Sequence, residues 1–306
     1  RRAEARGARE RPAQARAFED PMLMAELWQV PVSLNQVPLM FTLRQPLPWP
    51  GKLRARARAL EPDADRAQAD AASTLRALRL RLCQTYHAYR LASRAAAVLA
   101  ESRALLSTVI DATEIRYRVG RAELAELLRA QEERARLDTQ LVDLDRERAL
   151  AASALRALLG WSGDAPLGEA VTAPEVVDVP ERAALLALAL ARRPELAAQR
   201  ALVAKARAQE QAAQVERAPD LAAWAGFMAM LGGRDHTFTV GVQTSLPTFS
   251  LQRSAAAARE AQATGDAARA ALRQLEADVG AELDDARLRL LTAARHIGLH
   301  RDSLVP

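Results

Sequence analysis

Two short segments of the chain alternate apolar and polar residues with the period of a β-strand. The apolar positions are Leu39, Phe41 and Leu43 in the first segment and Phe238, Val240 and Val242 in the second. The polar positions include Thr42 and Arg44 in the first segment and Thr239 and Gln243 in the second. Because successive side chains of a strand point to opposite faces, both segments predict strands with one apolar and one polar face.

Each alternating strand follows a segment that is apolar on both faces, Met22–Val30 in the first case and Leu221–Leu231 in the second. Turn-forming residues lie between the strands, at Pro31–Val37 and at Gly232–Asp235, so both regions predict β-hairpins. A single hairpin is marginal in water. The two hairpins must therefore pair with each other, with other chains, or with both.

The predicted strands have about 9 to 11 residues, which is the length that a tilted strand needs to cross a bilayer. One apolar and one polar face is the pattern of a membrane barrel wall, with lipid outside and water inside. With that assignment the lumen-facing candidates are Thr42, Arg44, Thr239 and Gln243. The edge of a soluble β-sandwich would alternate in the same way, and Arg44 could equally be a solvated residue at a strand end.

Long helical patterns dominate the rest of the chain. No proline or glycine occurs from Asp63 to Tyr117, which predicts a helix about 80 Å long. Gly120 interrupts the pattern, and a second helix is expected from Glu123 to Leu159, where Gly160 ends it. Leucines of this second helix are spaced four and three residues apart, as in a coiled coil.

A connector rich in glycine and proline, Trp161–Pro180, follows the second helix. Three further helices are expected, from Glu181 to Arg192, from Pro194 to Ala218, and from Ser254 to Leu299. Pro194 fits the first turn of its helix, where the missing backbone N–H costs nothing.

The order of hairpin, Leu-Pro pair and long helix occurs twice. Leu47-Pro48 aligns with Leu246-Pro247 at an offset of 199 residues. Chance similarity between alanine-rich segments is the alternative, but it does not explain the shared order of elements. The repeat predicts that a helix before the first hairpin is reduced to a remnant and that the last helix stops before a counterpart of the Gly120 turn. Residue 1 is not Met and no signal peptide is visible, so the start is expected to be cut.

These elements predict a mainly α fold with two β-hairpins. The expected parts are a helix remnant (1–18), a first hairpin (19–47), a long helical hairpin with its tip near 117–123 (48–160), a connector (161–193), a helix of the second repeat (194–218), a second hairpin (219–247) and a long helix (248–306).

The composition agrees with long helices packed along seams, because aromatic residues make up only 4% of the chain. The formal charge is +5, but arginines alternate with acidic residues over Arg116–Arg148. Such mixed charge is typical of a solvated helix face and not of a surface that binds nucleic acid. No run of about 18 apolar residues predicts a transmembrane helix, and the single Cys83 excludes an intrachain disulfide.

Two sets of residues have metal-binding chemistry. His296 and His300 are spaced i, i+4 on one helical face, where they could bind a metal ion in transit; no carboxylate or cysteine completes the site, which favours two solvated residues. Methionines recur at strand spacing, at Met22 and Met24 and at Met228 and Met230. Thioethers suit copper(I), but filling of an apolar wall is the simpler interpretation.

No catalytic constellation occurs. The sequence has no Gly-x-Ser-x-Gly, no phosphate-binding glycine loop, no His-Glu-x-x-His and no Cys-x-x-Cys. We therefore expect neither an enzyme nor a cofactor.

Several short motifs occur along the chain. They are QPLPWPGK at Gln45–Lys52, RYRVG at Arg116–Gly120, LLRAQ at Leu127–Gln131, RPEL at Arg193–Leu196 and APDL at Ala218–Leu221. Together they resemble the TolC family of outer-membrane efflux proteins, over about residues 19 to 300. The first of them resembles the strand-to-helix junction of the branch that serves metal-exporting pumps.

In that family three chains each give two hairpins to one barrel in the outer membrane, and their long helices form a tunnel through the periplasm. The resemblance implies a homotrimer in the lipid bilayer, a periplasmic adaptor and an inner-membrane pump as partners, and a passive export conduit as the function. It also implies that the tip residues Tyr117, Arg118, Val119 and Gly120 dock the adaptor.

Two other classes of protein share part of this pattern. A periplasmic adaptor also has a long helical hairpin, but it adds a β-rich block that this sequence lacks. A coiled-coil scaffold would not need strands of membrane length with an apolar face. The cargo stays open among drugs, proteins and metal ions, and the Pro-Gly-Lys junction favours metal ions.

Overall fold

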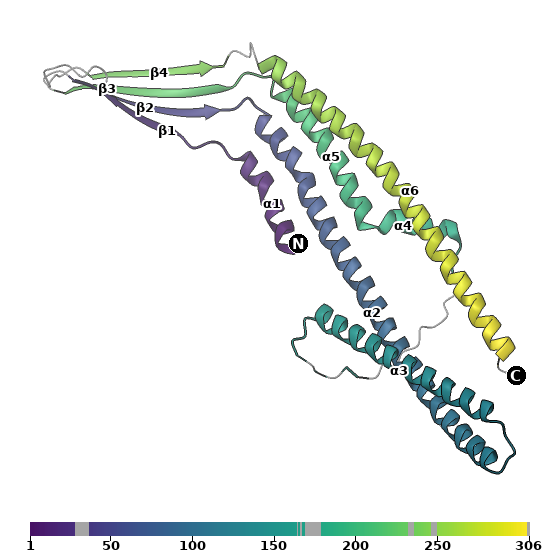
Figure 1. The fold of residues 1–306 in the computed structure, drawn as a ribbon. Coiled ribbons are helices and arrows are strands. Elements are labelled where there is room, and N and C mark those ends of the chain that lie inside the picture. The colour runs from purple at the N-terminus through teal and green to yellow at the C-terminus, as the bar shows by residue number, and fades with distance from the viewer. Residues whose placement is uncertain are drawn as a thin grey trace. The chain divides into compact units, whose positions relative to one another are not determined.

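The computed structural model describes residues 1–27, 37–163, 165, 167–168, 179–231, 236–245 and 250–304. Most of these residues are helical, and the others include a small antiparallel sheet (Figure 1). The chain divides into two compact units, one made of Arg1–Ser73 and Asp178–Pro306 and the other of Thr74–Val177. The helix α2 (Lys52–Arg118) begins in the first unit and ends in the second.

The sheet of the first unit has four strands in the order β1-β2-β3-β4, and all neighbours are antiparallel. The strands are β1 (Met22–Leu27), β2 (Val37–Leu47), β3 (Leu221–Leu231) and β4 (His236–Thr244). The two hairpins pair with each other through β2 and β3, and Leu47 lies opposite Leu221. Both predicted hairpin turns fall largely outside the described residues.

The same elements recur at the offset that the sequence predicts. β1 begins at Met22 and β3 at Leu221, which is 199 residues later. β2 and β4 begin at the same separation, at Val37 and His236. The predicted internal repeat is therefore confirmed in the order and spacing of the elements, although Leu246 and Pro247 lie outside the described residues.

Two helices extend beyond the boundaries predicted from the sequence. α2 begins at Lys52, before the predicted start at Asp63, and contains Pro62. A proline inside a helix removes one backbone hydrogen bond, but here the flanking turns pack against the rest of the unit, since Ala57 and Ala59 are buried. The helix has 67 residues and is about 100 Å long. The last helix, α6 (Ser250–Leu304), also begins before its predicted start.

The helices of the first unit pack through small residues and polar contacts. α5 (Pro194–Val215) lies against α6, where a Cβ built on Gly265 would be 3.5 Å from the Cβ of Ala206. Ala206 is 1% exposed, so the small side chains allow a close approach. α1 (Arg2–Arg16) lies beside α2, and Arg9 Nη2 donates to Gln68 Oε1 at 2.7 Å. α4 (Arg182–Arg192) is a short helix that contacts α6.

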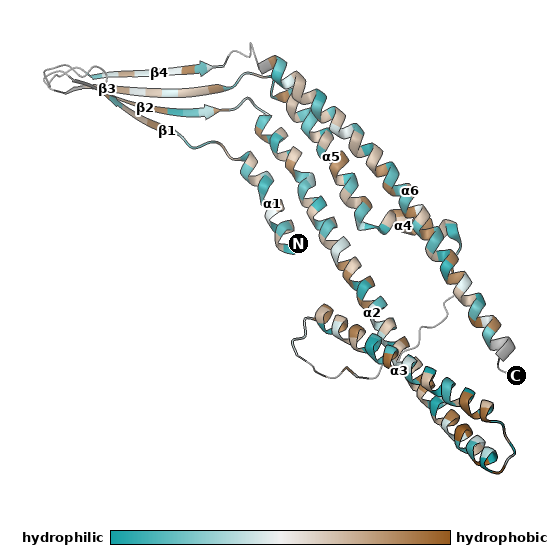
Figure 2. Cartoon of the chain, in the orientation of Figure 1, coloured by the Kyte–Doolittle hydropathy of each residue, from teal (hydrophilic) through white to brown (hydrophobic). Residues whose placement is uncertain are grey.

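The second unit is a helical hairpin made of the distal part of α2 and α3 (Leu124–Leu159). Gly160 ends α3 in a left-handed conformation with φ 69°, as the sequence predicts. Figure 2 shows hydrophilic and hydrophobic residues interspersed along these helices. Among the described residues, no helix has an apolar stretch of the length needed to cross a membrane.

Candidate functional site

The register of the sheet assigns each residue to one of two faces, because directly opposite residues on neighbouring strands share a face. Trp224 is opposite Gly241, and Gly226 lies between Thr42 and Thr239. A Cβ built on Gly241 would be 2.7 Å from the indole of Trp224, and one built on Gly226 would be 2.7 Å from Thr239 Oγ1. These contacts identify a common face for all five residues, which we call the polar face.

The polar face brings together all four of the predicted lumen residues, although two hairpins far apart in the sequence supply them. Its members with described side chains are Met22, Met24, Glu26, Met40, Thr42, Arg44, Pro46, Ala222, Trp224, Gly226, Met228, Thr237, Thr239, Gly241 and Gln243. Thr42, Arg44, Thr239 and Gln243 thus share one face. That this face lines a lumen stays a prediction.

The opposite face, which we call the apolar face, is hydrophobic at its centre, and its polar members Gln45, His236 and Thr244 lie toward the strand ends. Its central members are Leu23, Ala25, Leu27, Leu39, Phe41, Leu43, Ala223, Ala225, Phe227, Phe238, Val240 and Val242. Leu23, Val240 and Val242 are 71%, 70% and 75% exposed. Large exposed hydrophobic surfaces mark sites of contact with lipid or with another protein.

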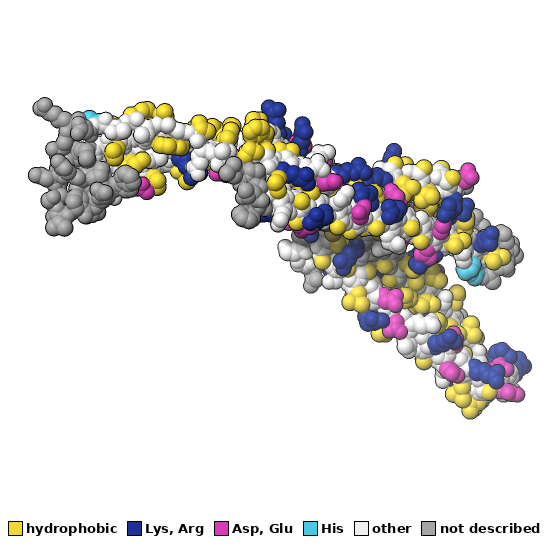
Figure 3. Space-filling view, turned by 90° about the horizontal axis from the view of Figure 1, so that it is seen from above, with side chains coloured by type: hydrophobic (Ala, Val, Ile, Leu, Met, Phe, Trp, Pro, Cys, Tyr) yellow, Lys and Arg dark blue, Asp and Glu magenta, His cyan; other side chains and the backbone are white. Residues whose placement is uncertain are grey.

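The space-filling view shows how charged side chains are distributed between the sheet and the helices. In Figure 3 the described part of the sheet carries mainly hydrophobic and uncharged side chains, whereas Lys and Arg intermingle with Asp and Glu over the helices. The sequence could not orient β1 and β3, because nearly all of their residues are apolar and Glu26 is the only charged residue in them. The residues opposite them on β2 and β4 assign each residue of β1 and β3 to a face.

The base of the sheet is tied to the helices by a buried lysine. Lys52 begins α2, is 2% exposed, and donates from Nζ to Asp220 Oδ1 at 2.8 Å. Glu216 Oε2 lies 3.6 Å from the same ammonium, and Glu216 Oε1 accepts from Arg56 Nε at 2.6 Å. The hydrogen bond to Glu216 raises the pKa of Arg56. These contacts join the end of α5 and the start of β3 to the start of α2.

Sequence reasoning assigned Lys52 no role beyond its motif. A signal was present, because the chain has only two lysines among 43 basic residues. The other lysine, Lys205, is also in an ion pair between α5 and α2, with its Nζ 2.8 Å from Asp63 Oδ1. Both lysines therefore tie α2 to α5 or to the residues that directly follow it.

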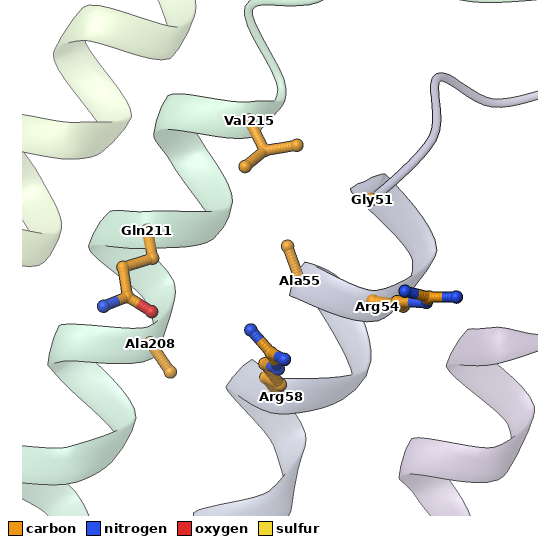
Figure 4. Close-up of a pocket in the computed structure, with 7 residues that line it drawn as sticks. All are labelled: Gly51, Arg54, Ala55, Arg58, Ala208, Gln211 and Val215. Carbon is orange, nitrogen blue, oxygen red and sulfur yellow. The ribbon is translucent and has the colours of Figure 1, made fainter.

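A pocket of about 310 Å³ separates α2 from α5 just beyond this ion pair. Figure 4 shows Ala55 of α2 and Val215 of α5 pointing toward each other, with Arg58 reaching toward α5 and Arg54 turned away from it. Ala55, Ala208 and Val215 give the lining its apolar groups, and Arg54, Arg58 and Gln211 give it polar ones. The pocket has no group of residues suited to catalysis.

The predicted docking tip is a tight turn between α2 and α3. Gly120 has φ +69°, and its N–H donates to the Tyr117 carbonyl at 2.9 Å, while the Arg121 N–H donates to the Arg116 carbonyl at 2.8 Å. This pair of bonds closes the end of α2. Tyr117 is 41% exposed and Val119 63%, and Arg118 pairs with Glu114. The turn presents apolar groups to solvent, but docking at this tip stays a prediction.

The histidine pair lies near the end of α6. His296 and His300 are both exposed. Within the part of the chain that the structure describes, no group of three or more His, Cys, Asp or Glu side chains could hold a metal ion. The structure therefore brings no further such ligand to the pair.

Comparison with known protein families shows which family the chain belongs to. The sequence matches the model of the family described as "Outer membrane efflux protein" over residues 32–161 and 185–305, which is most of its length. The chain belongs to this family. The resemblance seen in the sequence and the predicted fold class are thereby confirmed. Membership places this efflux protein in the outer membrane.

Solved structures with the same fold agree with this assignment. The outer membrane protein VceC of Vibrio cholerae has a TM-score of 0.77 and 19% identity, and the match covers 98% of this chain and 77% of that one. For the outer-membrane channel OprN the values are 0.75 and 19%, with 98% and 74% covered. For the CmeC channel of Campylobacter jejuni they are 0.69 and 14%, with 99% and 73% covered. No protein with a curated description matches the chain.

Proposed function

We propose that this efflux protein is a subunit of a passive export channel whose barrel wall includes the four-stranded sheet. The polar face lines a water-filled lumen, and the apolar face contacts lipid. The observation that carries the proposal is the separation of the two faces, with Val240 and Val242 on one and Thr239 and Gln243 on the other. A barrel wall in a membrane needs this alternation, because lipid and water lie on opposite sides of one strand.

Closure of the barrel requires further copies of the chain. Within the described residues β1 and β4 each have one neighbouring strand, so both edges of the sheet are open. Open edges are costly in lipid, because no water is present to satisfy the backbone N–H and C=O groups. A homotrimer resolves this cost by pairing β1 of one copy with β4 of the next.

The helices also carry surface that a trimer would cover. Leu91 and Leu105 of α2 are 71% and 70% exposed, and Leu288 of α6 is 62% exposed. Apolar groups this exposed favour packing against neighbouring helices. In the proposed assembly the helical hairpin of residues 48–160 and the helix of residues 248–306 line a periplasmic tunnel, and the segment 161–193 connects the two repeats.

The conduit itself has no catalytic role in this proposal. Cargo is driven by an inner-membrane pump and handed on through a periplasmic adaptor that docks at Tyr117–Gly120. The exposed Tyr117 and Val119 supply apolar contacts there, and the closed turn at Gly120 holds them in place.

Two adjacent residues of β4 provide a matched test of the faces. In a Cys83→Ser background of the full-length protein, Thr239→Cys and Val240→Cys each introduce one thiol, and both parent residues are exposed in the single chain. Intact cells or outer-membrane vesicles are treated with a charged, membrane-impermeant maleimide. We expect Thr239→Cys to react and Val240→Cys to stay unlabelled until the membrane is dissolved in denaturant.

Membrane fractionation and an unheated gel complete the test. A heat-modifiable trimer in the outer membrane, together with selective labelling of Thr239→Cys, supports the proposal. Equal labelling of both positions would contradict the division into lumen and lipid. A soluble monomer would favour the coiled-coil scaffold instead.

A further inference from the structure

The methionines of this chain are confined to one feature. All five lie in the two hairpins, at Met22, Met24, Met40, Met228 and Met230, and none occurs in the helices. The four with described side chains all belong to the polar face. The backbone of Met230 pairs with Pro38 in the same register.

Three of these methionines are neighbours across β1, β2 and β3. Glu26 is opposite Met40, and Met40 is opposite Met228, so one row crosses three strands. Met24 is opposite Thr42 and therefore diagonal to Met40. Directly opposite residues have Cβ atoms about 5 Å apart. The Met40 methyl group reaches toward β3, because it would be 3.4 Å from a Cβ built on Gly226.

The polar face is an unexpected place for methionines that only fill space. Met22 and Met24 are 53% and 49% exposed, and Met40 and Met228 are half-buried. A gap-filling methionine is normally enclosed by other side chains. The central positions of the apolar face are occupied by Leu, Phe, Val and Ala, and none of its described members is Met. The thioethers therefore lie on the face that carries the threonines and the charged side chains.

We propose that Met24, Met40 and Met228, with Glu26 beside them, bind a soft monovalent cation such as Cu(I) or Ag(I). Thioether sulfur is a soft, neutral ligand that favours such ions over hard ions such as Mg²⁺ or Ca²⁺. The three flexible side chains allow their sulfur atoms to converge from neighbouring strands. The Glu26 carboxylate supplies the opposite charge at the same row.

The position of the site along the sheet follows from the charged groups that share its face. Arg44 is opposite Met22 and Trp224, two rows from Met40. Its guanidinium disfavours a cation at Met22, so the site is centred on the row of Glu26. In the proposed channel this row is part of the lumen wall, and the inference rests on the proposed function in that respect.

The test measures Ag(I) binding by the purified full-length protein in detergent, in the Cys83→Ser background that removes the exposed thiol, using isothermal titration and X-ray absorption at the silver edge. The variant Met40→Leu/Met228→Leu removes two thioethers and conserves side-chain volume, so the sheet should be retained. We expect its affinity for Ag(I) to fall by at least about tenfold and the silver–sulfur scattering to decrease.

A second variant tests whether the location of the methionines matters or only their number. Leu23 and Leu43 are directly opposite on the apolar face. Adding Leu23→Met/Leu43→Met to the double variant restores the number of methionines but places two of them on the face proposed to contact lipid. We expect Ag(I) binding to stay weak.

Each outcome bears on one proposal. Unchanged Ag(I) affinity in Met40→Leu/Met228→Leu, or full recovery after Leu23→Met/Leu43→Met, would overturn the cation site. Labelling of Thr239→Cys by the charged maleimide reports separately that the polar face meets water. If that labelling succeeds while the binding results are negative, the cation site fails and the channel stands.

Discussion

The ion pair of the buried Lys52 gives the sharpest prediction about stability, because the lysine and its carboxylate partners differ strongly in their exposure to water. Lys52 is 2% exposed, whereas the side chains of Asp220 and Glu216 are 51% and 33% exposed. Removing the Asp220 carboxylate leaves the buried Lys52 ammonium without its closest partner. Removing the ammonium leaves carboxylates that water can reach. We therefore expect Asp220→Ala to be more damaging than Lys52→Met.

The magnitudes follow from that asymmetry. Breaking a buried ion pair by deleting one partner costs about 3–5 kcal/mol when the remaining charge is uncompensated. Glu216 remains at 3.6 Å from Lys52, so we expect the lower end, about 3 kcal/mol, for Asp220→Ala. Lys52→Met keeps the apolar stem and leaves Glu216 paired with Arg56, so we expect about 1 kcal/mol. The double variant should cost little more than Lys52→Met alone.

The assay is guanidinium unfolding of the purified full-length protein in detergent, followed by far-ultraviolet circular dichroism. The exposed pair Arg289–Asp285 provides a control, since Asp285→Ala should change the free energy of unfolding by less than about 0.5 kcal/mol. Equal destabilisation by Asp220→Ala and Lys52→Met would refute the reasoning, as would a double variant whose cost is the sum of the two.

Three further changes test other parts of the structure. Gly241→Ala would bring a Cβ within 2.7 Å of the Trp224 ring, so we expect a loss of about 1–3 kcal/mol in thermal unfolding, and Trp224→Leu in the same chain should recover part of it. Gly120→Ala forces an L-residue to φ +69° and should cost about 1 kcal/mol and reduce co-purification with the adaptor, while Gly120→Asn should be milder. Arg182 donates to Asp284 and lowers the pKa of that carboxyl below its ordinary value of 3.8; the stabilisation is therefore present above that value and is lost as pH falls through the lowered pKa. After correction for the intrinsic exchange rate at each pH, the protection of α4 amides should fall on acidification, and Asp284→Asn should remove this change in protection.

Local features of this protein were readable from the sequence because they depend on near neighbours in the chain. The two-residue period of Thr239, Val240, Gly241 and Val242 assigns them to opposite faces of β4 wherever the strand lies. Gly160 ends α3 because a left-handed residue closes the last turn at low cost. The long helices follow from stretches rich in alanine, leucine and charged residues. The predicted start of α2 at Asp63, where the stretch without proline or glycine begins, was wrong, because α2 begins at Lys52 and contains Pro62. Packing around the buried Ala57 offsets the hydrogen bond that Pro62 cannot make.

Only the tertiary structure decided which distant segments meet. β1 and β3 have apolar residues on both sides, and Glu26 is their only charged residue, so their faces are assigned by register with β2 and β4 and not by a periodicity of their own. The pairing of β2 with β3 joins residues almost 200 positions apart, and no local pattern encodes such a contact. The burial of Lys52 and the gathering of the methionines on one face depend on that same pairing. The sequence thus determined the elements and their periodicity, whereas the faces they share arise from long-range backbone hydrogen bonds.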